Sequence, residues 1–479
     1  MNMFSLPGRR TFAKTLGFAG ALTTTRVRGL AAQAAVNPNT TLDGIAEDLH
    51  SAIITYPMHD THCHASSDQL GTTTPDQFLL DLSLAALPQA NYFPAGVLQQ
   101  WRDGAGPTRA SLDQRYGISK KLDEIRFHFR QSMFVKYLTK ELAAFLKCAP
   151  RWETVVAARN ERGKDYPRYI SDLFRDVRLT NAMVDTGCCE GMGARGFNAF
   201  AQAIRPCEMR AISRAETIYG PLMRQEFSFE ELETRYKQGV GDALDGTGNY
   251  GFKSWGMKSH LLSRLGLLKP TWDSDLAKKS WEDYKRLRGT PSLDREEAAD
   301  RGRGLNEYLF TIALEECLKR DMPMQMHAGD GDAPSVILRR QHPYNLEEVV
   351  RFDRDGVMRM PKLILVHAGY PLLKEAAWMS HLYTNCYFDI SLMNPVINLG
   401  LTQRFGEILE AVPMSKVVFG SDSWKVPEIN WLAGKWGKRS LSQALAVYVK
   451  EKVLTRDESL EGAQMMLHEN NRRLYGLPA

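Results

Sequence analysis

Met58-His59-Asp60-Thr61-His62-Cys63-His64 is the stretch of the chain at which a regular fold first becomes evident. In a β-strand, side chains at positions i and i+2 share a face, so His62 and His64 point to the same side while Cys63 points away. Two imidazoles on one face can hold a single metal ion together. Because a His-x-His pair is common without a metal, the prediction depends on what the rest of the chain adds.

Seven more short apolar runs follow, separated by stretches with helical periodicity such as 305–319 and 402–411. Eight strands that alternate with helices predict an α/β fold, namely a (β/α)8 TIM-like barrel. The seven runs lie at residues 181–186, 208–212, 252–258, 322–327, 363–367, 386–390 and 416–420.

Two segments interrupt this alternation. From about residue 75 to 178 the chain reads as helix after helix, which predicts a helical insertion after strand one of a single barrel over residues 35–479. The polar stretch 269–304 predicts a loop with one exposed helix. Its Trp272, Trp281 and Tyr284 either lean over the barrel mouth or belong to a solvated crossover.

Residues that bind metals stand at the ends of several predicted strands. In such barrels the chemistry is carried at the C-terminal ends of the strands. Each of these residues alone has a plainer explanation, as a hydrogen-bonded core histidine or as a helix cap. Together they predict a site for a divalent metal such as Zn²⁺, Mn²⁺, Fe²⁺ or Co²⁺. They are His62 and His64 on strand one, Lys258 on strand four, His327 on strand five, His367 on strand six and Asp422 after strand eight.

Lys258 has three readings, because a lysine inside a barrel mouth is costly unless it is paired or chemically changed. A carboxylated Lys258 would bridge two metal ions. An ammonium would bind a carboxylate of the substrate. The third reading is a salt bridge to Asp422 or Asp389.

The N-terminus resembles an export signal. Gly8-Arg9-Arg10-Thr11-Phe12-Ala13-Lys14 is similar to a twin-arginine motif, and Ala32-Gln33-Ala34 to a small-x-small cleavage site. We therefore expect a signal peptide over residues 1–34, export by the twin-arginine translocase and a periplasmic location. The alternative is a disordered basic tail. The chain's seven cysteines, an odd number without C-x-x-C spacing, do not predict a disulfide framework.

The charge and hydropathy of the chain exclude two classes of partner. The formal net charge is +5, and the segment 1–34 carries all of it, because it contains five basic residues and no acid. A neutral remainder predicts no nucleic-acid partner. No run of 18 apolar residues occurs beyond the N-terminus, so we expect no stable membrane anchor. We expect a small-molecule substrate, and a homo-oligomer remains open.

The order of the metal-binding residues resembles that of the amidohydrolase superfamily. Within it, the chain is similar to the amidohydrolase-2 group and its FluG/nodulin-type amidohydrolase domain, and the helical insertion is similar to that of uronate isomerases in the same superfamily. The stretches that carry the resemblance are 255–267, 325–332, 366–371, 388–392, 419–423 and 427–431.

This resemblance implies a metal-dependent hydrolase of a C–N bond in a small molecule, an amide and in particular a γ-glutamyl-type amide, with Zn²⁺ as one or two ions. His62, His64, His327 and Asp422 would bind the metal, and Asp422 would also transfer the proton. His367 would either bind a second ion beside a carboxylated Lys258 or stabilise the oxyanion. Arg264 would clamp a substrate carboxylate, although a surface salt bridge explains it equally well.

Three other functions remain open at this point. The first is a nonhydrolytic, metal-dependent decarboxylase of the amidohydrolase-2 type, which would release CO₂ in place of an amine. The second is a sugar-acid isomerase. The third is a periplasmic binding protein without catalytic activity, for which Asp422 beside three histidines would serve no purpose.

Overall fold

The computed structural model describes residues 41–64, 71–83, 93, 97–187, 197, 200–205, 207–248, 251–288, 295–329, 337–351, 360–424 and 426–478. Residues Thr41–Ala479 form one compact unit. The predicted signal peptide, Cys188 and Cys189 lie outside the described residues. No helix among the described residues is long and apolar enough to cross a membrane.

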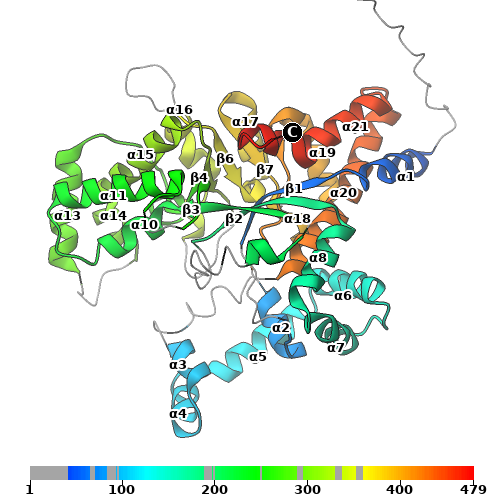
Figure 1. The fold of residues 1–479 in the computed structure, drawn as a ribbon, viewed down its shortest axis with the longest axis horizontal. Helices are drawn as coiled ribbons and strands as arrows, with labels where there is room; N and C mark the ends of the chain where they lie inside the picture. Colours follow the sequence, from blue (N-terminus) through cyan, green and yellow to red (C-terminus); the bar gives the residue numbers. More distant parts are fainter. Residues whose placement is uncertain are drawn as a thin grey trace, which may run out of the picture. The chain divides into compact units, whose positions relative to one another are not determined.

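Eight parallel strands form one sheet in the order β1-β2-β3-β4-β5-β6-β7-β9 (Figure 1). The last strand is short, and the chain after it continues the pairing with β1. The backbone N–H of Thr61 donates to the carbonyl of Phe419 (2.8 Å), and that of His64 donates to the carbonyl of Ser423 (2.7 Å). These bonds join the first strand to the last, which confirms the predicted (β/α)8 barrel. The strands are β1 (Met58–His64), β2 (Leu179–Asp185), β3 (Glu208–Arg214), β4 (Ser254–Ser259), β5 (Met324–His327), β6 (Leu363–Val366), β7 (Cys386–Asp389) and β9 (Val417–Val418); β8 (Ser391–Leu392) forms isolated bridges only.

Helices lie around the sheet, and their ends follow ordinary capping chemistry. The Ser228 hydroxyl accepts from the Glu231 N–H (3.1 Å) at the start of α11, and Gly246 ends that helix with φ 75°. Helices α10, α11 and α15 pack on β3 and β4, whereas α20 packs on β1 (Figure 1). The helices after β2 are α10 (Ala215–Leu222), α11 (Phe229–Asp245), α12 (Leu261–Leu265), α13 (Ser274–Leu287), α14 (Arg295–Arg301), α15 (Arg303–Lys319), α16 (Glu347–Arg351), α17 (Leu373–Leu382), α18 (Met393–Val396), α19 (Leu401–Ala411), α20 (Pro427–Lys450), α21 (Arg456–Gln464) and α22 (Asn470–Leu474).

The predicted insertion between β1 and β2 is helical. One buried ion pair attaches it to α20, since the Arg159 Nε donates to the Glu428 Oε1 (2.5 Å) with both side chains fully buried. The Tyr169 hydroxyl donates to the same oxygen (2.9 Å). Its helices are α2 (Pro75–Leu82), α3 (Val97–Asp103), α4 (Pro107–Tyr116), α5 (Ile118–Phe129), α6 (Met133–Leu146), α7 (Trp152–Gly163) and α8 (Tyr166–Asp176), and α1 (Leu42–Ile53) precedes β1.

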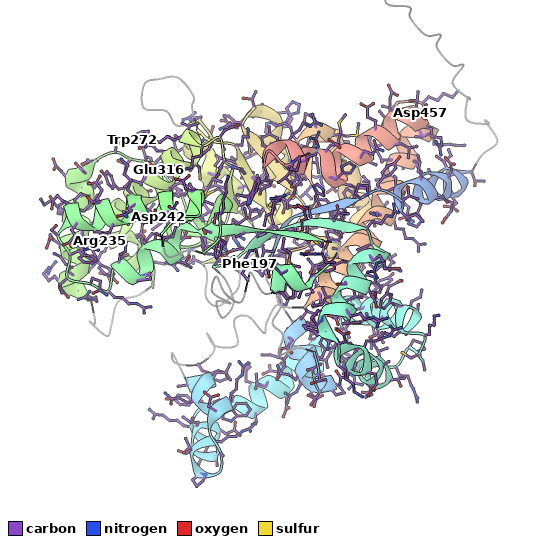
Figure 2. The ribbon with its side chains drawn as sticks, viewed as in Figure 1. Phe197, Arg235, Asp242, Trp272, Glu316 and Asp457 are labelled. Carbon is purple, nitrogen blue, oxygen red and sulfur yellow. The ribbon has the colours of Figure 1, made fainter. Side chains whose placement is uncertain are left out.

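The expectation of a loop with one exposed helix over residues 269–304 is wrong. The segment contains two helices, α13 and α14, and α13 packs on α15. Trp281 is fully buried and its Nε1 donates to the Phe227 carbonyl (3.0 Å). Trp272 lies over α15 (Figure 2), where its Nε1 donates to the Glu315 carboxylate (2.6 Å). These indole donors are satisfied in the outer helical layer, so neither ring leans over the barrel mouth.

Candidate metal centre

The ends of the barrel strands bring six predicted residues together. His62 and His64 come from β1, Lys258 from β4, His327 from β5, and His367 and Asp422 from the turns after β6 and β9; all six are buried. His367 has φ 74° and Asp422 φ 53°, a conformation that few non-glycine residues adopt. Such strained turns persist where the surrounding structure holds them, and they are concentrated at functional sites.

Three imidazoles surround the Asp422 carboxylate. Its Oδ1 lies 3.1 Å from the His62 Nε2 and 3.2 Å from the His64 Nε2, and its Oδ2 lies 3.6 Å from the His367 Nδ1. Burial alone raises the pKa of a carboxyl, but His367, His62 and His64 outweigh it and hold the pKa of Asp422 well below its usual range. Asp422 is therefore ionised at neutral pH.

The imidazoles of His62 and His367 are neutral at that pH. Burial, with the charge of Lys258 beside it, lowers the pKa of His62 to about 4. Burial also lowers the pKa of His367 well below its usual value. The His367 Nε2 lies 3.1 Å from the His327 Nδ1, which brings the β5 histidine into the same group. A neutral imidazole is the form that binds a metal.

This donor set fits a divalent cation. Ligand atoms of His62, His367 and Asp422 lie within 4.8 Å of one another, and so do those of His62, His64 and Asp185. The buried Nδ1 atoms of His62 and His64 have no hydrogen-bond partner among the described residues. A shared ion would satisfy these buried imidazoles and the carboxylate, and an N/O set favours Zn²⁺ and its neighbours.

Lys258 is fully buried in this cluster. Its Nζ lies 2.6 Å from the His62 Nε2 and 3.9 Å from the Asp185 Oδ2. Of the three readings of Lys258, the salt bridge was expected to Asp422 or Asp389, but the carboxylate within ion-pair distance is Asp185. Burial lowers the pKa of Lys258 to about 8, against the opposing charges of Asp185 and Asp422. Near neutral pH, part of the amine is therefore unprotonated, and this is the form that CO₂ carboxylates.

Asp185 was missed by the sequence reasoning. It is the last residue of β2 and accepts from the Arg214 Nη2 (2.5 Å), and its Oδ2 lies 3.9 Å from the His64 Nδ1. Although burial acts to raise it, the charges of Arg214, His64 and Lys258 hold the pKa of Asp185 below its usual value. Its position at a strand end in the predicted run 181–186 was the signal that could have found it.

His260 was missed as well. Its ring centroid lies 4.3 Å from that of His327, and its backbone N–H donates to the Glu216 Oε1 (2.8 Å). Burial, then the charge of Arg214, lowers the pKa of His260 well below its usual value. The residue follows Lys258 by two positions, so the end of the fourth strand carries more of the site than the lysine alone.

Arg264 lies apart from the cluster. It is an exposed residue of α12 and lines a cavity of about 540 Å³ together with Glu216, Tyr219 and Tyr284. The structure thus brings six of the seven predicted site residues together and places the seventh in a separate hollow.

Comparison with known proteins finds similarity to one protein family and to one curated relative. The profile of the amidohydrolase family matches residues 276–477. The protein FluG of Emericella nidulans is 26% identical over 351 residues, which cover 68% of this chain; the chain spans 38% of the length of that relative.

Solved structures share the fold over almost their whole length. A protein of Lactobacillus casei ATCC 334, assigned as a metal-dependent hydrolase, has a TM-score of 0.66 at 20% identity and covers 89% of this chain and 97% of its own. The uronate isomerase of Bacillus halodurans C-125 has a TM-score of 0.56 at 14% identity and covers 92% and 98%.

Proposed function

We propose that this chain is a metal-dependent hydrolase of the amidohydrolase superfamily and that it cleaves a C–N bond of a small molecule, such as an amide of the γ-glutamyl type. The superfamily as a whole comprises metal-dependent hydrolases and related isomerases and decarboxylases. The observation that carries the proposal is the convergence of His62, His64 and His367 on the ionised Asp422.

His62, His64, His327 and Asp422 would hold a divalent ion, which we propose is Zn²⁺. Such an ion, when bound, polarises a carbonyl and makes coordinated water more acidic. A second ion would use His367 and a carboxylated Lys258. The Asp185 carboxylate lies 3.9 Å from both the Lys258 Nζ and the His64 Nδ1, so it would orient these two side chains.

Asp422 would move the proton. Its ionised carboxylate accepts a proton from the attacking water, whose oxygen forms a bond to the carbonyl carbon. The C–N bond then breaks, and Asp422 gives the proton to the leaving nitrogen. His367, neutral because it is buried, would stabilise the negative charge on the carbonyl oxygen if it does not bind a second ion.

The test combines metal analysis with product analysis. We expect one or two Zn²⁺ per chain by elemental analysis and release of an amine or ammonia from a panel of small amides. Asp422→Asn keeps the fold and lowers kcat by about 10²–10⁴-fold, because the carboxylate no longer takes up a proton. A protein that binds no divalent metal, or an Asp422→Asn variant with the wild-type rate, would contradict the proposal.

The same panel distinguishes the related reactions. Release of CO₂ from an aromatic or vinylogous acid would identify a decarboxylase. Conversion of a uronate to its ketose would identify an isomerase, which needs a proton moved between two carbon atoms and no water added.

We also propose that the protein is exported to the periplasm by the twin-arginine translocase. Support comes from Arg9-Arg10 and the small-x-small stretch 32–34, and from the five cysteines among the described residues, which are all free thiols. A fusion of residues 1–40 to a reporter should reach the periplasm only when the translocase is intact. A reporter that stays in the cytoplasm of such cells would refute the proposal.

A further inference from the structure

A second cavity stands at the same end of the barrel as the metal centre. Its volume is about 540 Å³, and α10 and α12, which begin just after β3 and β4, form part of its wall. A smaller cavity of about 300 Å³ is lined by Ile54 and Val177, which precede β1 and β2. It therefore lies at the opposite end of the barrel, away from the centre.

Glu216 and His260 connect the larger cavity to the metal centre. The Glu216 Oε1 accepts from the Ser259 hydroxyl (2.7 Å) and from the His260 N–H (2.8 Å). The His260 ring in turn lies 4.3 Å from the His327 ring. The carboxylate is thus fixed through one oxygen to the end of β4, one residue beyond Lys258.

Residues that line the cavity carry buried polar atoms without a hydrogen-bond partner in the described part of the chain. The Glu216 Oε2, the Tyr219 hydroxyl and the Ser263 Oγ are buried and make no hydrogen bond to any described residue. Burial raises the pKa of Tyr219, so its phenol keeps its proton and can donate. Arg264 is exposed on the same wall. The residues that line the cavity therefore bring together one fixed carboxylate acceptor, one guanidinium and two hydroxyl groups.

We propose that this cavity is the subsite for a carboxylate whose neighbouring carbon carries a hydrogen-bond donor, either an amino or a hydroxyl group. The donor binds the Glu216 Oε2, and the carboxylate accepts from Arg264, Tyr219 and Ser263. The inference rests on the proposed function, since it assigns the cavity to the non-reacting end of the same substrate.

Three small probes test this chemistry, because L-alanine, L-lactate and propionate differ only in the substituent next to the carboxylate. Their dissociation constants are measured by ligand-observed NMR on the Zn²⁺-loaded protein. We expect alanine or lactate to bind about tenfold more tightly than propionate, as one hydrogen bond to a charged group provides. Alanine and lactate, unlike propionate, can also chelate Zn²⁺, so only a preference that Glu216→Gln abolishes belongs to the cavity. Such a preference for alanine identifies an amino acid, and one for lactate identifies a hydroxy acid. Equal affinity for all three, or no binding of any, would overturn the proposal.

Glu216→Gln tests the role of the carboxylate. The donors of Ser259 and His260 hold the amide carbonyl where Oε1 was, so the amide NH₂ replaces the acceptor Oε2. The preference over propionate should disappear. Glu231→Gln, on the exposed side of α11, is the matched control and should keep it. A Glu216→Gln variant that keeps the preference would refute the assignment.

Arg264→Gln tests the anion-binding half and should weaken all three probes about tenfold, because the charged hydrogen bond to the carboxylate is lost. Arg235→Gln is its control; Arg235 lies on α11 (Figure 2) and pairs with Glu231 (3.0 Å). If Arg264→Gln binds the three probes with unchanged affinity, the proposed role of Arg264 in carboxylate binding is refuted.

Metal content, measured on the same samples, separates the two proposals. A protein that binds no divalent metal but prefers alanine or lactate would refute the proposed function and support the subsite. A protein that retains its metal but shows no preference would refute the subsite alone.

Discussion

At the level of single residues, burial of imidazoles controls how the protein responds to acid. His59, on β1 but outside the metal cluster, illustrates this: its ring centroid lies 5.8 Å from that of His468 and its Nδ1 is buried without a partner among the described residues. Burial, then the charge of His468, lowers the pKa of His59 from 6.5 to about 4. Between these two pKa values, His59 is therefore neutral in the folded protein and protonated in the unfolded chain.

The stability of the protein should fall on acidification through this range, and His59 should account for part of the fall. Between pH 6.5 and about 4 the unfolded chain binds the additional proton, so stability is present above pH 6.5 and lost as the pH falls through that window. The contribution is about 3 kcal/mol. His59→Gln should flatten the dependence of the urea unfolding free energy on pH. A variant with the slope of the wild type would show that His59 is not the source.

At the level of elements, the helical insertion depends on its attachment to α20. Arg159 of α7 and Glu428 of α20 are both fully buried. The pair is worth little as a net gain, because both charges lose their hydration on folding. Removing one partner, however, leaves the other charge buried and unpaired.

Arg159→Met should therefore lower the free energy of unfolding by about 3–5 kcal/mol. The double variant Arg159→Met/Glu428→Gln should recover part of this loss, because no unpaired charge remains. Arg162→Met, on the exposed side of the same helix, is the control and should change stability little. Guanidinium denaturation measures all three. A double variant that is less stable than the single one by the full cost of Glu428→Gln would show that the two residues are not coupled.

At the level of the whole molecule, a bound metal should stabilise the entire barrel, because the proposed ligands come from β1, β5 and the turn after β9. An ion that binds only the folded state adds about 3–4 kcal/mol at concentrations of 10²–10³ times its Kd. Chelation should thus lower the Tm of the wild type. Asp422→Asn binds the ion less well, so its Tm should respond less to chelation. A wild-type Tm that is the same with and without chelator would contradict this.

Much of this architecture could be predicted from the sequence, and the exceptions have physical reasons. His62, His327 and His367 were found because apolar strands end in residues of a type rarely buried without purpose. Asp185 was missed because the predicted run 181–186 ends one residue later, at Thr186, whereas β2 ends at Asp185 itself.

Two further features depend on contacts that periodicity does not record. Glu216 of α10 is held by hydrogen bonds from Ser259 and His260, which are 43 and 44 residues away in the chain. Trp281 was misjudged because its burial depends on Phe227, a partner 54 residues away in the chain.

The bonds that close the barrel also determine when the centre can exist. His64 and Asp422 are 358 residues apart in the chain, yet the Asp422 N–H donates to the His62 carbonyl (2.8 Å). During synthesis, a nascent chain that has emerged only as far as β7 has its first histidines but lacks the carboxylate around which they gather. High-affinity capture of an ion at this site would thus come last in folding, and the time course of metal uptake by a refolding chain would report when its last strand closes the barrel.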